Sequence, residues 1–186
     1  MSGPPFWGKY RGTVSDNQDP LMTGRIKAKV PDVLGDVESG WALPCAPFAG
    51  ASTGFVAVPP SGALVWIEFE HGDPDYPVWS GAFWGSMKDL PQKAIAPPPP
   101  WKKVMIVTEG GNQFILDDTP GVGGITLETS GGQKITMTQM GVEITNGQGA
   151  SIKLSPTGVE ITNGQGATVA LQAIKVSVNN GALEVM

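Results

Sequence analysis

The sequence predicts an all-β protein, with a small barrel followed by a rod of repeated short strands. Of its 186 residues, 26 are glycine and 17 are proline, 40% are hydrophobic and only 16% are charged. The hydrophobic fraction is too high for a disordered chain, and the many turn-forming residues favour short strands over long helices. A ten-residue segment, GVEITNGQGA, also occurs twice, beginning at Gly141 and again at Gly158. Such a repeat is typical of stacked structural units.

Charge and cysteine content exclude several classes of protein. A net charge of −5 argues against nucleic-acid binding, which relies on clustered Lys and Arg. The single cysteine, Cys45, excludes an internal disulfide framework and the usual zinc spacings, so we expect it to be a half-buried apolar residue. No run of eighteen apolar residues occurs, and the N-terminal MSGPPFWGKY lacks a basic-then-apolar pattern. We therefore expect no membrane span, no secretory signal, and synthesis and assembly in the cytoplasm.

Residues 1–86 form the predicted barrel and carry nearly all the aromatic side chains. In GRIKAKVP, Ile26, Ala28 and Val30 share one face, and ALVWIEFE alternates in the same way. Five or six strands in about eighty residues favour a closed barrel, because closure removes the exposed edges of an open sheet. The predicted strands, separated by proline and glycine clusters, cover residues 10–15, 24–30, 40–44, 55–58 and 63–70.

Residues 87–103 are predicted to be a proline-rich linker. Their four consecutive prolines interrupt both helices and sheet ladders, because proline lacks the backbone N–H group. A polyproline segment is semi-rigid and extended. The linker is therefore expected to hold the barrel at a distance from the rest of the chain.

Residues 104–186 form the predicted rod, in which apolar and polar residues alternate. The charged residues Glu143, Lys153, Glu160, Lys175 and Glu184 fall on one face of the strands. Asn-Gly or Asn-Asn pairs at 146, 163 and 179 mark positions where the backbone turns with positive φ. The residues predicted on the other face, as an inward core, are Val142, Ile144, Ile152, Leu154, Val159, Ile161, Val169, Leu171, Ile174, Val176, Val178, Leu183 and Val185.

This apolar stripe is too narrow to stabilise a single chain. Each strand offers only two or three apolar positions and no aromatic residue follows Phe114, so burial falls short of the conformational entropy lost on ordering. Three copies that face their stripes toward a shared axis solve this problem, and we predict a homotrimer. A uniform cross-section needs the same residues at each level, which explains why the decapeptide is repeated.

Two other structures are compatible with the repeat. A meander in which each Asn-Gly makes a tight hairpin turn leaves one apolar face exposed and prone to aggregation. A calcium-binding solenoid requires a Gly-Gly-x-Gly-x-Asp ladder, which this sequence lacks. The trimeric rod is the preferred interpretation.

Several motifs of residues 8–86, taken in order, resemble the N-terminal barrel of phage baseplate assembly protein V. They are YRGTVSDNQDPLMTGRIKAKVPDV, WALPCAPFAG and PPSGALVWIEFEHGDPDYPVWSGAFW. They also resemble the related central spike proteins of contractile tails and type VI secretion systems. GGNQFILDDTPGVGGITLETSGGQKITMT, residues 110–138, resembles the start of the trimeric β-helix of those proteins.

The resemblance implies an oligonucleotide/oligosaccharide-binding (OB) type barrel, used as a collar, and a trimeric β-helix used as a needle. It also implies two partners, a hub protein of the baseplate and a tip protein with proline-alanine-alanine-arginine (PAAR) repeats. The tip protein is expected at the end formed by Glu184-Val185-Met186, because this segment has no histidines that could hold a metal ion. The barrel residues that carry the motifs are Asp19, Pro20, Gly24, Arg25, Pro31, Trp41, Trp66, Gly72, Asp73, Pro74, Pro77, Trp79 and Gly81.

The sequence departs from the family pattern in three ways. Ala63 stands where a more polar residue such as Asp is commoner, the linker carries no lysozyme-like insert, and the fused hub domains of long type VI members are missing. A separate hub protein is therefore expected.

No constellation of catalytic residues stands out. His71 is the only histidine and lies in a Gly-Asp-Pro turn context, and neighbouring carboxylates such as Asp73 with Asp75, or Asp117 with Asp118, fit turn chemistry. Phosphate-loop, nucleophile-elbow and zinc-helix motifs do not occur. We predict a protein that is not an enzyme and holds no cofactor or metal.

The predicted function is that of the central spike of a phage tail or contractile injection particle, which pierces the target envelope when the sheath contracts. Two alternatives remain open. The barrel could bind a glycan or single-stranded nucleic acid through Trp41, Trp66 or Trp79, with the rod as a stalk. The protein could also be an accessory of a cell-wall hydrolase, in which Glu68 and Glu70 would meet the substrate.

Overall fold

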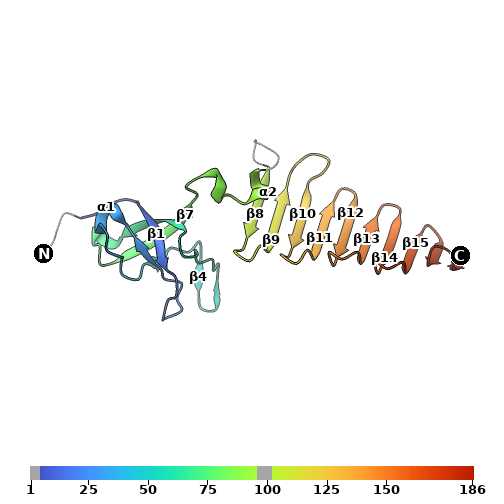
Figure 1. Cartoon of the computed structure of the whole chain (residues 1–186), viewed down its shortest axis with the longest axis horizontal. Coiled ribbons are helices and arrows are strands. Elements are labelled where there is room, and N and C mark those ends of the chain that lie inside the picture. Colours follow the sequence, from blue (N-terminus) through green and yellow to red (C-terminus); the bar gives the residue numbers. More distant parts are fainter. Residues whose placement is uncertain (1–4, 96–101) are drawn as a thin grey trace. The chain divides into compact units, whose positions relative to one another are not determined.

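The computed structural model describes residues 5–95 and 102–186 (Figure 1). They divide into two compact units, Met1–Asp89 and Leu90–Met186, here called the N-terminal and C-terminal units. Almost all regular structure in both units is β, which confirms the predicted all-β class. Within the described residues no helix has the length and hydropathy that crossing a membrane requires.

The N-terminal unit is a curled sheet that closes into a small barrel. Ile26, beside β2, and Ala42, beside β3, exchange backbone hydrogen bonds of 3.2 and 2.8 Å, which joins the two ends of the sheet. In the described residues the strand order is β2-β1-β6-β7-β3. Its strands are β1 Tyr10–Asp16, β2 Lys27–Lys29, β3 Leu43–Pro44, β6 Leu64–Phe69 and β7 Pro77–Phe83.

Alternate residues of these strands fill the barrel, as predicted. In β6 the burial alternates residue by residue, so that Val65 and Ile67 are fully buried while Trp66 between them is half-buried on the outer face. The core consists of Val14, Ile26, Ala28, Val30, Ala42, Val65, Ile67 and Phe69, with Trp79 packed against it.

Four expectations for the N-terminal unit were wrong. Residues 55–58 form no strand; the preceding segments β4 (Ala49–Gly50) and β5 (Thr53–Gly54) make a separate small hairpin instead. Strand β7 was not predicted, and Cys45 is exposed. Short helices also occur, namely α1 Pro31–Leu34, η1 Glu70–Gly72 and η2 Met87–Asp89.

The proline-rich linker stays a prediction. Its prolines at 97–100 fall within residues 96–101, which lie outside the described residues. The flanking parts contain η2 and α2, Gln92–Ile95. Helix α2 belongs to the C-terminal unit, where it packs against β8 and where Lys93 forms an ion pair of 2.5 Å with Glu128.

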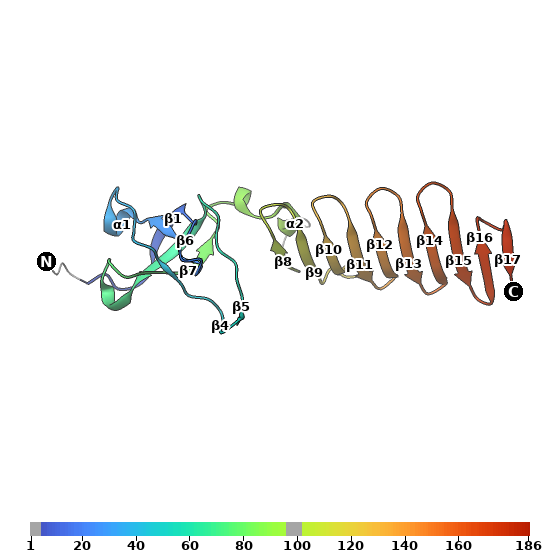
Figure 2. The same cartoon turned by 90° about the horizontal axis from the view of Figure 1, so that it is seen from below.

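The C-terminal unit is one antiparallel sheet, here called the C-terminal sheet, whose strands follow each other in sequence order (Figure 2). Each strand between β8 and β17 pairs with the strand before it and the strand after it in the chain. The strands are β8 Lys103–Val107, β9 Gln113–Asp117, β10 Gly124–Glu128, β11 Lys134–Thr138, β12 Gly141–Thr145, β13 Ser151–Ser155, β14 Gly158–Thr162, β15 Thr168–Gln172, β16 Lys175–Val178 and β17 Leu183–Val185. In this respect the sheet is like the meander considered from the sequence: consecutive strands form antiparallel hairpins, and this pattern continues along the whole sheet.

The two edges of the C-terminal sheet carry different connections (Figure 2). Loops of four or five residues lie along one edge, here called the loop edge, and the other, called the turn edge, carries one six-residue connection and otherwise two-residue turns. The loop edge consists of residues 108–112, 129–133, 146–150, 163–167 and 179–182. The turn edge consists of residues 118–123, 139–140, 156–157 and 173–174.

Candidate subunit interface

One face of the C-terminal sheet is continuously apolar, and it is not covered within the chain. Ile144 pairs directly with Ile152, and Ile152 with Ile161, so that these side chains form a column across neighbouring strands. Ile144 is 41% exposed and Leu171, in the second column, is 43% exposed. Aliphatic side chains exposed in such a row mark a surface that another molecule covers.

The predicted core residues lie in register on this face, with one exception. Ile174 belongs to a two-residue turn with Ala173, because Gln172 pairs with Lys175 across the turn. Its side chain is 85% exposed, so its expected position among the strands was wrong. The predicted residues on the apolar face are Val142, Ile144, Ile152, Leu154, Val159, Ile161, Val169, Leu171, Val176, Val178, Leu183 and Val185.

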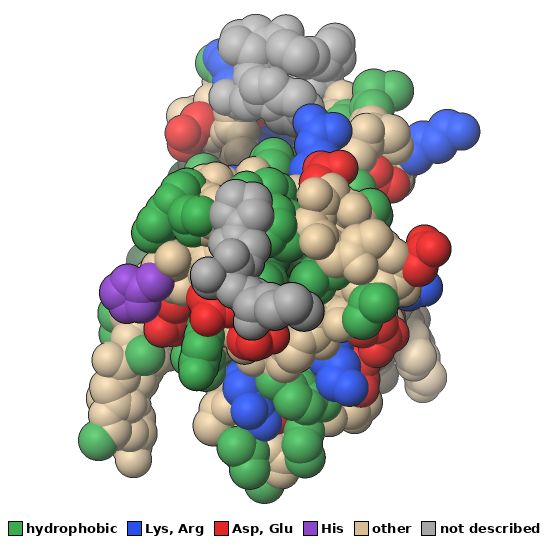
Figure 3. Space-filling model, turned by 90° about the vertical axis from the view of Figure 1, so that its left-hand side faces the viewer, with side chains coloured by type: hydrophobic (Ala, Val, Ile, Leu, Met, Phe, Trp, Pro, Cys, Tyr) green, Lys and Arg blue, Asp and Glu red, His purple; other side chains and the backbone are tan. Residues whose placement is uncertain are grey.

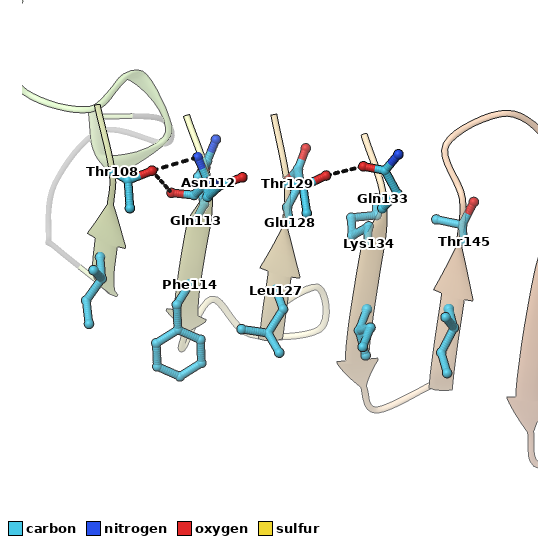
Figure 4. Close-up of a pocket in the computed structure, with 13 residues that line it drawn as sticks. Thr108, Asn112, Gln113, Phe114, Leu127, Glu128, Thr129, Gln133, Lys134 and Thr145 are labelled. Atoms are coloured by element: carbon cyan, nitrogen blue, oxygen red, sulfur yellow. Dashed lines mark hydrogen bonds between the residues drawn. The ribbon is translucent and has the colours of Figure 1, made fainter. Parts of the chain in front are cut away.

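The same face extends over four earlier strands that the predicted core did not include. In the close-up of Figure 4, Phe114 and Leu127 project side by side from adjacent strands, which agrees with their pairing. The alternation in KVMIV, QFILD, GITLE and KITMT carries the same signal and could have identified them. The additional residues are Val104, Ile106, Phe114, Leu116, Ile125, Leu127, Ile135 and Met137.

From β10 onward the opposite face is polar and carries ion pairs between neighbouring strands; in β8 and β9 it holds the paired Met105 and Ile115, of which Ile115 is buried. Lys153 lies 3.5 Å from Glu143, and Lys175 pairs with Glu184. This face fits contact with water. At the N-terminal end of the molecule, which Figure 3 shows, acidic and basic side chains are interspersed, without the continuous basic patch that favours nucleic-acid binding.

The first glycine of the decapeptide is required by a carbonyl group of the next strand. A Cβ atom on Gly141 would lie 1.9 Å from the Leu154 oxygen, and one on Gly158 would lie 2.0 Å from the Leu171 oxygen. Both glycines also have positive φ, 134° and 145°, which side chains rarely adopt. Gly124, which begins β10, is limited in the same way by the Met137 oxygen at 2.1 Å.

The Asn-Gly-Gln-Gly-Ala part of the decapeptide builds a loop that stacks on a neighbouring loop. The Asn146 side-chain oxygen accepts hydrogen bonds from the backbone N–H groups of Gln148 (2.8 Å) and Ala150 (3.0 Å). Asn163 makes the equivalent bonds in the second copy. A Cβ atom on Gly164 would lie 2.6 Å from the backbone of the loop before it, so only glycine permits this spacing.

Asp19 and Arg25, two of the barrel motif residues, organise one loop of the N-terminal unit. The Asp19 carboxylate accepts hydrogen bonds from the backbone of Leu21 and Thr23 and from the Arg25 side chain, at 2.6 Å from Nη2 and 3.0 Å from Nε. The side chain of Asp19 is only 4% exposed. The Arg25 guanidinium holds the pKa of this carboxyl group well below its usual range. Pro20 occupies the turn that begins at Asp19.

Replacing Asp19 by Asn is expected to destabilise the N-terminal unit at pH 7 and to matter less in acid. A carboxyl group whose pKa is lowered by folding contributes stability above its unfolded pKa of about 3.9, and this contribution is lost as the pH falls below that value. Thermal unfolding of wild type and variant should therefore differ at pH 7 and converge progressively below pH 4. Asp36→Asn, at an exposed position, is the control. Equal melting temperatures at pH 7 would contradict this role.

The three tryptophans considered for ligand binding do not form one platform. The Trp41 ring faces Arg25 and Lys27, with distances of 5.5 and 5.2 Å from its centroid. Trp66 stacks on Phe83 at the outer face of the barrel sheet, with centroids 4.7 Å apart. Trp79 points to the core side, and its indole N–H donates to the Gly24 carbonyl at 3.1 Å.

The other barrel motif residues occupy turns and strand starts. Asp73 and Pro74 form a turn closed by the Tyr76 N–H, and a Cβ on Gly72 would lie 2.7 Å from Pro5. Pro31 starts α1, Pro77 starts β7, and Gly81 adopts a φ of 134° in β7.

The residues examined for catalysis have structural partners or lie in turns. His71 is exposed in η1 with a φ of 53°, and Glu68 bonds to Lys9 (Figure 3). Asp117 accepts a hydrogen bond from the Thr119 hydroxyl at 2.5 Å, which lowers its pKa. Among residues 5–95 and 102–186, no three His, Cys, Asp or Glu side chains cluster closely enough to hold a metal ion.

Comparison with models of protein families gives two matches, one for each unit. Residues 10–84 match the type VI secretion system/phage-baseplate injector OB domain. Residues 103–159 and 153–184 match the phage baseplate V C-terminal trimerisation domain. No curated protein matches the chain.

Proposed function

Because this chain belongs to the phage baseplate V family of injector proteins, we propose that three copies of it form the central spike of a contractile tail or injection particle. Its barrel is an OB domain of the injector type, and its C-terminal sheet is a trimerisation domain. The role is structural, and chemistry on a substrate is not part of it.

The observation that carries this proposal is the apolar face of the C-terminal sheet. Its side chains are in register from β8 to β17, and many of them are more than one third exposed. A face of this length would make a single molecule insoluble or prone to aggregation. Burial against other copies of the same face removes this exposure, because the same residues are present at each level.

The length of the strands favours three copies. A strand of five residues spans about 17 Å, and facing sheets pack about 10 Å apart, so each sheet fills a depth of about 5 Å. The centre of an equilateral triangle with 17 Å sides lies about 5 Å from each side, so one layer of side chains fills a three-sided prism. A square of the same side leaves about 8.5 Å to the centre, and its middle would stay empty.

The prism would be suited to transmit force along its axis. Its strands run across the axis, so their backbone hydrogen bonds run along it from β8 to β17, as in stacked-strand fibrils. We propose that the N-terminal units attach to a hub protein of the baseplate, that the particle is assembled in the cytoplasm, and that sheath contraction drives the prism through the target envelope.

The last strand offers a site for a tip protein. Leu183 and Val185 of β17 are 59% and 58% exposed, and β17 pairs only with β16 within the described residues. A PAAR-type protein, which the family resemblance implies, would cover these side chains and the free edge of the strand.

Light scattering on the purified full chain tests the trimer. The expected mass is three times the chain mass of 19.4 kDa. A mass of one chain in dilute, non-denaturing buffer would overturn the spike model. The role in the particle is tested by electron microscopy of particles made without the protein, which should lack complete baseplates until wild-type protein is supplied.

A further inference from the structure

Three of the four connections on the turn edge of the C-terminal sheet expose an apolar side chain outside the apolar face, and the fourth, residues 156–157, carries Pro and Thr. Met140 is 74% exposed and Ile174 is 85% exposed, and Val122 in the longer connection is 75% exposed. Residues at the tips of such turns are ordinarily Gly, Pro, Asn, Asp or Ser. Neither Met140 nor Ile174 is needed to form its turn, so their presence indicates that something covers this edge.

The loop edge carries a matching polar feature. Within the described residues, the side-chain amides of Gln148 and Gln165 make no hydrogen bond, although the backbone N–H of each donates to the preceding Asn. The other loop-forming residues of the decapeptide have a role inside the chain, as Thr145 and Asn146 show, and Val142 and Ile144 lie on the apolar face. A Gln side chain offers two donors and an acceptor on an apolar stem, which fits a contact with an exposed turn.

The proposed trimer brings these edges together; this step rests on the function proposed above. In a closed ring of three parallel copies, each corner joins the loop edge of one copy to the turn edge of the next. Loops and turns alternate along the sheet, so a loop lies level with the gap between two turns of the neighbour. Loop 146–150 falls between turns 139–140 and 156–157, and loop 163–167 falls between 156–157 and 173–174.

We propose that neighbouring copies interlock at the corners of the prism through these loops and turns. Gln148 lies beside Met140 of the next copy, and Gln165 lies beside Ile174 of the next copy. The amide of each Gln bonds to backbone carbonyls of the turn, and its stem covers the apolar side chain. This contact gives Ile174 a place in the trimer that lies outside the axial core.

Cysteine cross-linking tests the contact in the full chain, on a Cys45→Ser background that removes the exposed native thiol. The variant Met140→Cys/Gln148→Cys is treated with a short bismaleimide linker and run on a denaturing gel. Covalent trimers are expected, because each copy is linked to the next around the ring. The pair Ile174→Cys/Gln165→Cys tests the second corner level independently.

Three controls separate the corner contact from random linking. Met140→Cys alone and Gln148→Cys alone should stay single chains on the gel. The same residue of each copy lies at a different corner of the prism, about 17 Å from the next. The mismatched pair Met140→Cys/Gln165→Cys is offset by three strand spacings, about 14 Å, and should link at least fivefold less.

The mass of each variant by light scattering separates the possible failures. A trimeric variant whose matched pairs link no better than the mismatched pair overturns the interlocked corners and leaves the trimer standing. A mass of one chain for the Cys45→Ser background overturns the trimer and the corners together.

Discussion

Replacing Leu171 by Lys is expected to abolish the trimer, while the same change at the adjacent Ala170 leaves it intact. Both residues lie in β15, but on opposite faces of the sheet. Leu171 is 43% exposed in the single chain, so the chain itself tolerates a charge there. In the prism, three ammonium groups would lie at one level near the axis without a partner, and each costs several kcal/mol to desolvate.

Ala170→Lys is a suitable control because a Lys at this position is expected to be stabilising. Ala170 pairs across the strands with Glu160, so a Lys there gains an acidic neighbour on the polar face. Light scattering should report three chains for Ala170→Lys and one chain, or an aggregate, for Leu171→Lys. A trimer of normal stability for Leu171→Lys would show that the apolar face does not form the axis.

The second large effect is expected from Gly158→Ala, which should destabilise the C-terminal sheet by at least about 3 kcal/mol per chain through backbone strain and steric overlap. The new methyl group would lie 2.0 Å from the Leu171 oxygen, in a backbone with a φ of 145°. The start of β14 would have to move away from β15, where Val159 pairs with Leu171, which disrupts the ladder between β14 and β15.

Gly110→Ala is the matched control for this experiment. Gly110 lies in a loop of the same unit, with no atom within 4 Å of its would-be Cβ and no positive φ. Thermal or denaturant unfolding followed by circular dichroism should separate the two variants clearly. Equal stabilities would mean that the backbone at Gly158 relaxes at little cost, and that the repeat preserves this glycine for another reason.

The apolar face could be predicted because its signal is local. Every second residue of a strand shares a face, so Ile144, Ile152 and Ile161 could be assigned before their pairing was known. Ile174 lies two residues before Val176 and would share its face if the strand continued, but alternation does not reveal where a strand ends. The pairing of Gln172 with Lys175 places it in a turn.

Strand β7 was missed because its alternation is interrupted. The register with β6 shifts between Val65 and Ile67, so extra residues of β7 lie opposite Trp66. Gly81, with a φ of 134°, lies in this irregular part. Residues 55–58 show the reverse error. Phe55 and Val56 have strand propensity, but they are 49% and 86% exposed, and among the described residues no strand is formed by this segment.

The reasons for individual residues in the decapeptide needed the three-dimensional structure. The limit on Gly141 comes from the Leu154 carbonyl, which lies thirteen residues further along the chain. The network of Asp19 and Arg25 likewise depends on a loop shape that no local pattern specifies. Composition and alternation therefore predict the fold and the candidate interface, whereas steric limits between distant backbones do not appear in them.

Pairing between consecutive strands makes the C-terminal sheet modular. Gly124, Gly141 and Gly158 each open an equivalent two-strand module, seventeen residues apart. Inserting one more module would lengthen the sheet by about 10 Å and leave every other pairing unchanged. Tandem duplication of a short gene segment can thus change the length of the C-terminal sheet in whole increments of two strands.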